Sequence, residues 1–214
     1  MHRDGSVWCG GERGQVYRIE ADGSSMEQIA SSDGFSHGMA FDAGGRLYVS
    51  DSHAFKEPGP GILRFDPDGS GELWYGAPIN FANGLALIPE GNYIYVAETF
   101  GHAIFRVRIE DDGCAGAREE VAHLPGVLPD GLAFDDEGNL YVACYEPSQV
   151  LRVAPDGTVA CLIRDEEAHL LCHPTNLAFR GNVLFTTNLG RWHITVIDIE
   201  VEGLPLHGGY GGER

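Results

Sequence analysis

Short apolar runs alternate with glycine-, aspartate- and asparagine-containing segments along the chain, and nothing between the runs has a helical pattern. The runs are rich in β-branched and aromatic residues, as in Leu47-Tyr48-Val49 and Leu140-Tyr141-Val142. Asp-Gly dipeptides separate many of them, for example at 22–23 and 156–157. Runs of this kind predict short strands, and glycine-bearing turns between them are typical of antiparallel hairpins. The pattern therefore predicts an all-β protein.

These runs repeat with a period of about 45 residues. A segment that reads Gly or Asn, apolar, Ala, apolar begins at residues 38, 84, 131 and 176, at intervals of 46, 47 and 45 residues. Two further apolar runs belong to each unit, and a weaker outer run occurs at 72–75 and 158–161. A unit of four short strands with this period is typical of a β-propeller blade. We therefore predict a β-propeller of four-stranded antiparallel blades with about five repeat units, the first without its innermost strand.

The repeats assign residues 1–206 to a single propeller domain, with a last strand at 196–201. Residues 207–214 are rich in glycine and are expected to form a flexible tail, because such ends bury little surface. In all, 30 of the 214 residues are glycine, which suits a chain with many tight turns.

The charge of the chain narrows the range of partners. Lysine and arginine number 14 against 32 aspartate and glutamate residues, a formal net charge of −18. Such a surface repels phosphate backbones and anionic lipid heads, so we expect no nucleic-acid and no membrane partner. No apolar run reaches the ~18 residues of a membrane span and no apolar leader is visible, which indicates a cytoplasmic location. Five cysteines without a CxxC motif indicate reduced, buried thiols.

Polar residues precede the repeated apolar segment at the same position of each unit. They are His37, Asn83, Asp130 and Thr175, and they vary while the apolar residues after them stay alike. Because innermost strands line the channel of a propeller, we expect these four to line that channel and converge on one ligand site. Aspartate and asparagine oxygens suit a hard divalent cation such as calcium or magnesium, with water or substrate completing the coordination. The alternative is that Asn83 and Asp130 only stabilise their turns.

Two carboxylates fall at matching strand ends in consecutive units. Asp51 ends Val49-Ser50-Asp51, and Glu98 ends Val96-Ala97-Glu98. Two interpretations are open: the carboxylates support the site residues from behind, or they are solvated loop residues.

The motifs Phe81-Ala82-Asn83-Gly84-Leu85-Ala86-Leu87 and Leu128-Pro129-Asp130-Gly131-Leu132-Ala133-Phe134-Asp135 resemble those of the gluconolactonase/regucalcin/luciferin-regenerating-enzyme family. The resemblance extends over residues 4–206. It implies one divalent metal ion at the channel mouth, calcium first, with zinc, manganese or magnesium as alternatives. It also implies Asn83 and Asp130 as metal ligands, Asp130 as general base, and small sugar-type lactones as the substrates that are hydrolysed.

The family that the chain resembles has six blades and a ligand glutamate in a Glu-Gly-Pro motif, before the strand that here reads Asp4-Gly5-Ser6-Val7-Trp8. We expect one blade and that ligand to be missing from this sequence. These differences leave a second hypothesis open, a non-catalytic propeller that binds a small molecule or a protein. They also predict an unpaired blade edge that promotes oligomerisation and lowers stability.

Overall fold

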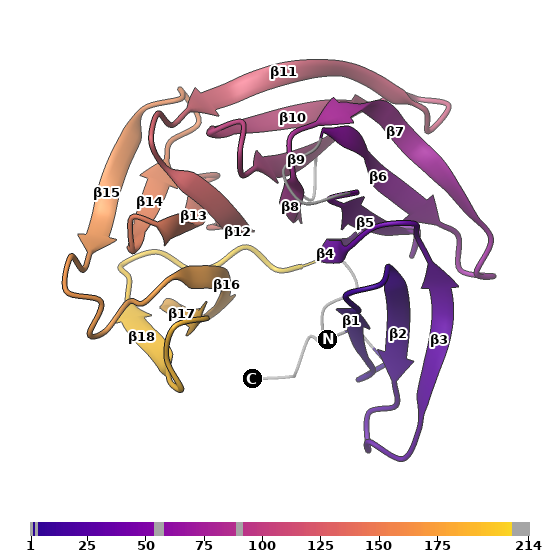
Figure 1. Cartoon of the computed structure of the whole chain (residues 1–214), viewed down its shortest axis with the longest axis horizontal. Coiled ribbons are helices and arrows are strands. Elements are labelled where there is room, and N and C mark those ends of the chain that lie inside the picture. Colours follow the sequence, from indigo (N-terminus) through magenta and orange to yellow (C-terminus); the bar gives the residue numbers. More distant parts are fainter. Residues whose placement is uncertain (1, 3, 54–57, 89–91, 207–214) are drawn as a thin grey trace.

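The computed structural model describes residues 2, 4–53, 58–88 and 92–206, which form 18 strands and no helix. Hydrogen bonds join the strands into five antiparallel sheets that are arranged around a common centre (Figure 1). The predicted all-β propeller with five units is therefore confirmed. Within the described residues, no helix is long and apolar enough to span a membrane.

Three of the blades have four strands, each paired with the next in sequence. The second blade contains β4 (Ser36–Phe41), β5 (Leu47–Asp51), β6 (Gly59–Phe65) and β7 (Gly71–Ile79). The third contains β8 (Ala82–Leu87), β9 (Tyr93–Glu98), β10 (Ala103–Ile109) and β11 (Ala115–His123). The fourth contains β12 (Leu128–Phe134), β13 (Leu140–Glu146), β14 (Gln149–Val153) and β15 (Val159–Arg164).

The first and last blades have three strands each. The first contains β1 (Val7–Gly10), β2 (Gln15–Ile19) and β3 (Met26–Ser31), and it lacks an innermost strand as expected. The last contains β16 (Pro174–Arg180), β17 (Val183–Asn188) and β18 (Ile194–Asp198), and in the described part of the chain it has no outermost strand. The final strand therefore starts and ends earlier than the predicted 196–201. The predicted tail, 207–214, lies outside the described residues.

Aromatic side chains from the repeated apolar runs hold neighbouring blades together. Tyr48 and Tyr141 are almost completely buried. Tyr141 meets Phe179 of the next blade edge-to-face, with ring centroids 5.1 Å apart, and Tyr95 meets Phe134 in the same way at 4.9 Å. Such pairs prefer an edge-to-face arrangement because the ring edge is positive and the ring face negative. The repeat therefore places a buried tyrosine at the same position of the second, third and fourth blades, at Tyr48, Tyr95 and Tyr141.

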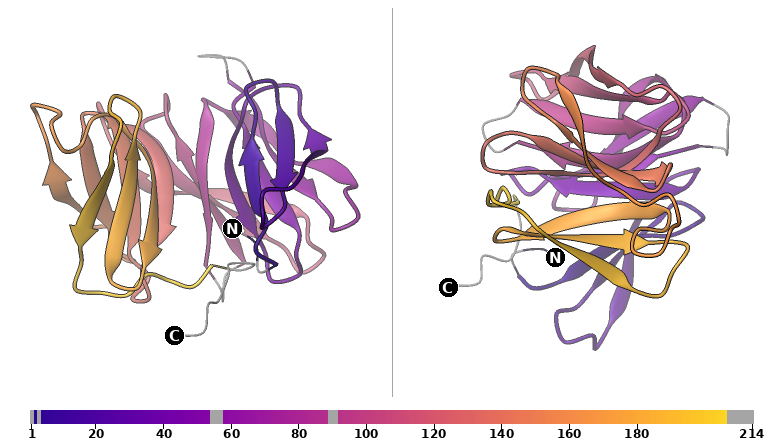
Figure 2. Two further views of the ribbon diagram at one scale, coloured as in Figure 1. Left: turned by 90° about the horizontal axis from the view of Figure 1, so that it is seen from below. Right: turned by 90° about the vertical axis from the view of Figure 1, so that its left-hand side faces the viewer.

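The five blades form an arc around the channel, and the chain after β18 crosses one end of this arc (Figure 2). The N–H of Gly203 donates to the carbonyl oxygen of Gly181, and the N–H of Leu204 to that of Phe134, both at 2.9 Å. Phe134 and Gly181 stand at or just after the C-terminal ends of the innermost strands of the last two blades. The crossing segment thus covers the end of the channel opposite to the predicted site.

All five cysteines are free, as predicted. Only Cys144 and Cys172 are buried, whereas Cys114 and Cys161 are exposed. The expectation of buried thiols therefore holds for part of the set.

Candidate functional site

The four predicted site residues stand at the beginnings of the four innermost strands. His37, Asn83 and Thr175 are the second residues of β4, β8 and β16, and Asp130 is the third residue of β12. In the arc, β8 packs beside β4 and β12, and β16 packs beside β12. The structure therefore brings the four positions to the same end of the channel, in the order in which they occur along the chain.

Glycine follows three of these residues and lets the innermost strands approach each other. A Cβ atom on Gly38 would lie 2.5 Å from the carbonyl oxygen of Asn83, and one on Gly84 would lie 2.2 Å from that of Asp130. No side chain fits at such distances from backbone atoms, so only glycine permits this spacing. Each glycine thereby sets how closely the next site residue follows around the channel.

Asn83 and Asp130 interact with each other. A side-chain hydrogen bond from Asn83 lowers the pKa of Asp130, but desolvation of the half-buried carboxyl group has the larger effect and raises the pKa to about 8. No cationic side chain among the described residues contributes to that balance. A buried carboxyl group without a cationic partner is costly in its charged form, and a metal ion would remove that cost.

A threonine hydroxyl group orients Asn83 and links it to the strand that carries Asp130. The amide nitrogen Nδ2 of Asn83 donates to Oγ1 of Thr99 at 3.2 Å, and Oγ1 donates to the carbonyl oxygen of Pro129 at 2.7 Å. Both Asn83 and Thr99 are buried. Because the amide nitrogen is engaged, the amide oxygen is the atom of Asn83 that could ligate a cation.

His37 is held by a hydroxyl group in the same way. Its Nε2 atom lies 3.1 Å from Oγ of Ser52, which follows β5 as Thr99 follows β9. The imidazole ring also packs against Phe81, with ring centroids 5.0 Å apart. Burial lowers the pKa of His37, so the neutral imidazole is favoured. The Ser52–His37 pair therefore repeats the Thr99–Asn83 arrangement of the next blade.

Thr175 occupies the same position of the last blade with a different partner. Its Oγ1 lies 3.1 Å from Oγ1 of Thr187, on the neighbouring strand β17. Neither atom belongs to the cluster around Asn83 and Asp130, so Thr175 contributes a hydroxyl group to this end of the channel without a recorded contact to the other three.

A second feature repeats behind the site residues. The carboxylate of Asp51 accepts a hydrogen bond from the N–H of Gly34 at 3.1 Å, and that of Glu98 accepts one from the N–H of Asn80 at 2.8 Å. Gly34 and Asn80 each lie three residues before a predicted site residue. Asp51 and Glu98 are both buried, so the interpretation as solvated loop residues is wrong, and each carboxylate fixes the segment that precedes a predicted site residue.

The last blade uses an amide for the same purpose, which the sequence alone did not reveal. Oδ1 of Asn188 accepts a hydrogen bond from the N–H of Cys172 at 3.1 Å, and Cys172 lies three residues before Thr175. Asp51, Glu98 and Asn188 all lie two residues beyond the third residue of the repeated Leu-Tyr-Val-like run. That register would have identified Asn188.

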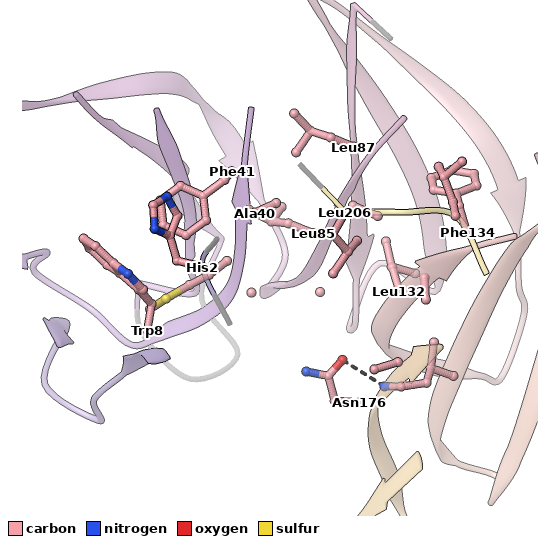
Figure 3. A pocket seen from close by; sticks show the side chains of 18 residues that line it. His2, Trp8, Ala40, Phe41, Leu85, Leu87, Leu132, Phe134, Asn176 and Leu206 are labelled. Carbon is pink, nitrogen blue, oxygen red and sulfur yellow. Dashed lines mark hydrogen bonds between the residues drawn. The ribbon is translucent and has the colours of Figure 1, made fainter. Parts of the chain in front are cut away.

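An apolar cavity of about 260 Å³ occupies the channel beyond the site residues (Figure 3). Its walls are the middle parts of the innermost strands, and Leu85, Leu132 and Leu206 surround the space. His2, Trp8 and Phe41 gather on one side of it, and Asn176, whose Oδ1 accepts the N–H of Leu177 at 2.9 Å, lies on another. The lining begins one residue after His37, Asn83 and Thr175, which therefore mark one end of this cavity.

The donor set suits a divalent cation with an open coordination sphere. Asn83 and Asp130 supply two oxygen-bearing side chains, and no group of three or more His, Cys, Asp and Glu side chains in the described part of the chain is arranged around one point. Two protein oxygens leave several positions of a six- to eight-coordinate calcium ion to water or substrate. The half-buried carboxyl group of Asp130, which among the described residues has no cationic side chain acting on it, is the observation that fits a cation here.

Comparison with known protein families agrees with the fold and the site motifs. The family model described as SMP-30/Gluconolactonase/LRE-like region matches residues 38–188, which include Asn83, Asp130 and Thr175. The chain belongs to the SMP-30/gluconolactonase/LRE-like family. The resemblance drawn from its Asn-Gly and Asp-Gly motifs is therefore confirmed.

Two curated relatives in this family are lactonases by name. The chain is 30% identical over 183 residues to a 6-deoxy-6-sulfogluconolactonase of Pseudomonas putida, an alignment of 81% of this chain and 61% of the relative. It is 28% identical to the lactonase drp35 of Staphylococcus haemolyticus, over 88% of this chain and 63% of the relative. The chain thus spans less than two thirds of the length of these relatives.

A solved structure is similar to this chain in its fold. The calcium-binding protein regucalcin of Agrobacterium tumefaciens is superimposed with a TM-score of 0.74 and 18% identity, over 95% of this chain and 76% of that chain. At this level of identity the likeness concerns the propeller fold.

Proposed function

We propose that this chain is a metal-dependent hydrolase of small, sugar-type lactones. Membership of the SMP-30/gluconolactonase/LRE-like family supports the proposal, as do the curated names of the two lactonase relatives. The observation that carries it is the pairing of Asn83 with the desolvated, cation-free carboxyl group of Asp130 at one end of an apolar channel.

Asn83 and Asp130 are the residues that would hold the metal ion, with calcium the first candidate and zinc, manganese or magnesium the alternatives. A divalent cation bound there supplies Lewis-acid polarisation of the lactone carbonyl group. Asp130 accepts a proton from the attacking water molecule, acting as general base. Asn83, whose amide nitrogen is bound to Thr99, would offer its amide oxygen to the ion.

The apolar channel wall favours a neutral substrate ring over bulk water next to Asp130. The net charge of −18 also disfavours strongly anionic substrates at low ionic strength unless the bound cation offsets it. A neutral lactone is compatible with both the apolar wall and the negative net charge.

Hydrolysis of glucono-1,5-lactone by the purified protein, measured with calcium, zinc, manganese or magnesium and with EDTA, tests the proposal. We expect a metal-dependent rate that falls by about 10²-fold or more in Asp130→Ala, because both a ligand and a base are lost. Exposed Asp136→Ala, in the turn after the same strand, is the matched control. Equal rates in wild type, Asp130→Ala and the EDTA sample would exclude the proposal.

A second candidate function is a binding propeller without catalysis, which recognises a small molecule or a protein. The observation that favours it is the exposed apolar surface of the last blade, where Ile194 and Val196 on β18 are 59% and 57% exposed. Binding without turnover, with metal bound and no rate above the Asp130→Ala control, would favour this alternative.

A further inference from the structure

We propose that two copies of this chain associate through the outer edge of β18, which pairs antiparallel with β18 of the second copy about a two-fold axis at Val196. The last blades of the two copies then form one continuous sheet, with three strands from each copy. β18 is the outer strand of the last blade, at the end of the arc, so a second copy can approach it without entering the channel (Figure 1). The association is therefore independent of the proposed hydrolase function.

β18 is the third strand of its blade, and the other third strands have a hydrogen-bonded neighbour on both sides. β2, β6, β10 and β14 each pair with a fourth strand, whereas among the described residues β18 pairs with β17 alone. The backbone groups along the outer side of β18 thus have no neighbouring strand in the described part of the chain. Such a row of unpaired N–H and C=O groups is a template for a strand from another chain.

The outer edges of the other blades carry features that discourage pairing between chains. The fourth strands β3, β7, β11 and β15 each show a register shift against the third strand of their blade. β7 also contains Pro78, and β11 carries three consecutive charged residues at 118–120. Bulges, prolines and charges are the usual protection of an edge strand. β18 pairs with β17 over five consecutive residues without a shift, and it has no proline and no charged residue before Asp198.

The last blade also lacks an arginine that the other blades share. The third strands of the first four blades carry an arginine at one register position: Arg18, Arg64, Arg106 and Arg152. In β18 this position is Val196, which pairs with Phe185 and is 57% exposed. Ile194 lies on the same face of the strand and is 59% exposed. In the proposed pair, Val196 lies opposite its own copy and diagonal to Ile194 of the second copy, within reach of apolar contact.

The charges at the two ends of β18 suit an antiparallel copy. Arg191 and His193 precede the strand, whereas Asp198 ends it and Glu200 follows. In an antiparallel pair the basic end of one strand lies beside the acidic end of the other, whereas a parallel pair would bring like charges together. Among the described residues no ion pair engages Arg191, Asp198 or Glu200, so these charges are available to a second copy.

Large apolar side chains lie around this edge. Leu189 and Trp192, in the loop that leads into β18, are 70% and fully exposed. Leu170 is also exposed, and its carbonyl oxygen accepts a hydrogen bond from Oγ1 of Thr195 on β18. A second copy at β18 would cover part of this apolar surface. One strand pair and a few apolar side chains form a small interface, so we expect a dissociation constant of about 1–100 μM.

Sedimentation velocity over a concentration series that spans this range tests the proposal. Val196→Arg restores the arginine of the other four blades, so the last blade should fold, but it places two arginines opposite each other in the dimer. We expect a dissociation constant at least about tenfold higher. Val159→Arg is the matched control, because Val159 is a 40% exposed residue on the outer strand β15 of the fourth blade. It should leave the dimer unchanged.

A charge exchange tests the antiparallel orientation. Arg191→Glu and Glu200→Arg should each weaken the dimer by about threefold or more, because like charges then meet at the ends of the paired strands. The double variant should recover the wild-type dissociation constant. Two single variants without effect would overturn the antiparallel pairing.

Cross-linking tests the register. In a protein with Cys114→Ser and Cys161→Ser, which removes the exposed thiols, Val196→Cys should form a disulfide-linked dimer on mild oxidation. Residues opposite each other in an antiparallel pair have Cα atoms ~4.5–5.5 Å apart, a separation that a disulfide spans. Val159→Cys in the same background should stay uncross-linked.

Three outcomes would overturn the proposal: a wild type that sediments as a monomer throughout the series, a dimer that Val196→Arg does not weaken, and a dimer that only Val159→Arg weakens. The last of these would place the contact on β15. Lactone hydrolysis is measured separately, so failure of the dimer leaves the proposed function standing, and failure of hydrolysis leaves the dimer standing.

Discussion

The desolvated carboxyl group of Asp130 predicts a stability cost that a single substitution removes. In the metal-free protein the pKa of this group is raised to about 8 by desolvation, whereas its ordinary value is 3.8. A carboxyl group with a raised pKa in the folded state contributes most to stability below its ordinary pKa, and that contribution is lost as pH rises toward 8. Asp130→Asn keeps the shape of the side chain and removes the titration.

The size of the effect follows from the two pKa values. One pKa unit corresponds to about 1.36 kcal/mol, so between pH 5 and pH 7 the wild type should lose about 3 kcal/mol of stability relative to Asp130→Asn. Titrations of all other groups are shared by the two proteins and cancel in the difference. More than about one unit above pH 8 the difference should become constant, because the carboxyl group is then ionised in both the folded and the unfolded wild type.

Urea unfolding of both proteins in EDTA, at half-unit steps from pH 5 to pH 8.5, measures this difference. Repeating the series with saturating divalent metal should stabilise only the wild type and abolish the pH dependence of the difference, because the metal replaces the proton on Asp130. A difference in unfolding free energy that stays flat from pH 5 to pH 8.5 in EDTA would refute the reasoning.

Three further predictions concern other parts of the structure. Gly84→Ala would place its Cβ atom 2.2 Å from a backbone carbonyl, so we expect a loss of about 2 kcal/mol or more in thermal unfolding and weaker metal binding. Thr99→Val removes the hydroxyl group that holds Asn83 and should lower metal affinity about tenfold, with recovery in Thr99→Ser, as measured by calorimetry. Replacing the exposed Ile194 and Val196 together by threonine should weaken self-association about tenfold in light scattering, since association through the β18 face would bury both side chains.

The fold could be predicted from the sequence because the same physical requirement recurs in every unit. Each blade must bury one face against the next, and the tyrosine of the repeated apolar run meets that need at Tyr48, Tyr95 and Tyr141. The number of strands in the last blade could not be predicted from the repeated run. The apolar residues at 194 and 196 look like core positions, yet both are exposed because no sheet covers that face among the described residues.

The positions of the site residues could be predicted from the sequence, but the residues that hold the preceding segments in place were harder to predict. His37, Asn83, Asp130 and Thr175 precede the repeated segment, so counting along the repeat locates them. The supporting residues lie at varying separations, 14 residues after His37, 15 after Asn83 and 13 after Thr175, because the intervening hairpins differ in length. Only the pairing between strands shows that all three accept the same backbone hydrogen bond.

The glycine of the repeated motif depends on the strand that follows it around the arc. Gly38, Gly84 and Gly131 each lie against the backbone of the next site residue, so a side chain is excluded at all three. In the last blade the corresponding residue is Asn176, and it is exposed. Within the described residues no innermost strand follows β16, so nothing there requires glycine. The glycine therefore occurs where two innermost strands are in contact, whereas the residue before it can vary. This separation allows one blade to present an imidazole and its neighbours an amide and a carboxylate at the same end of the channel.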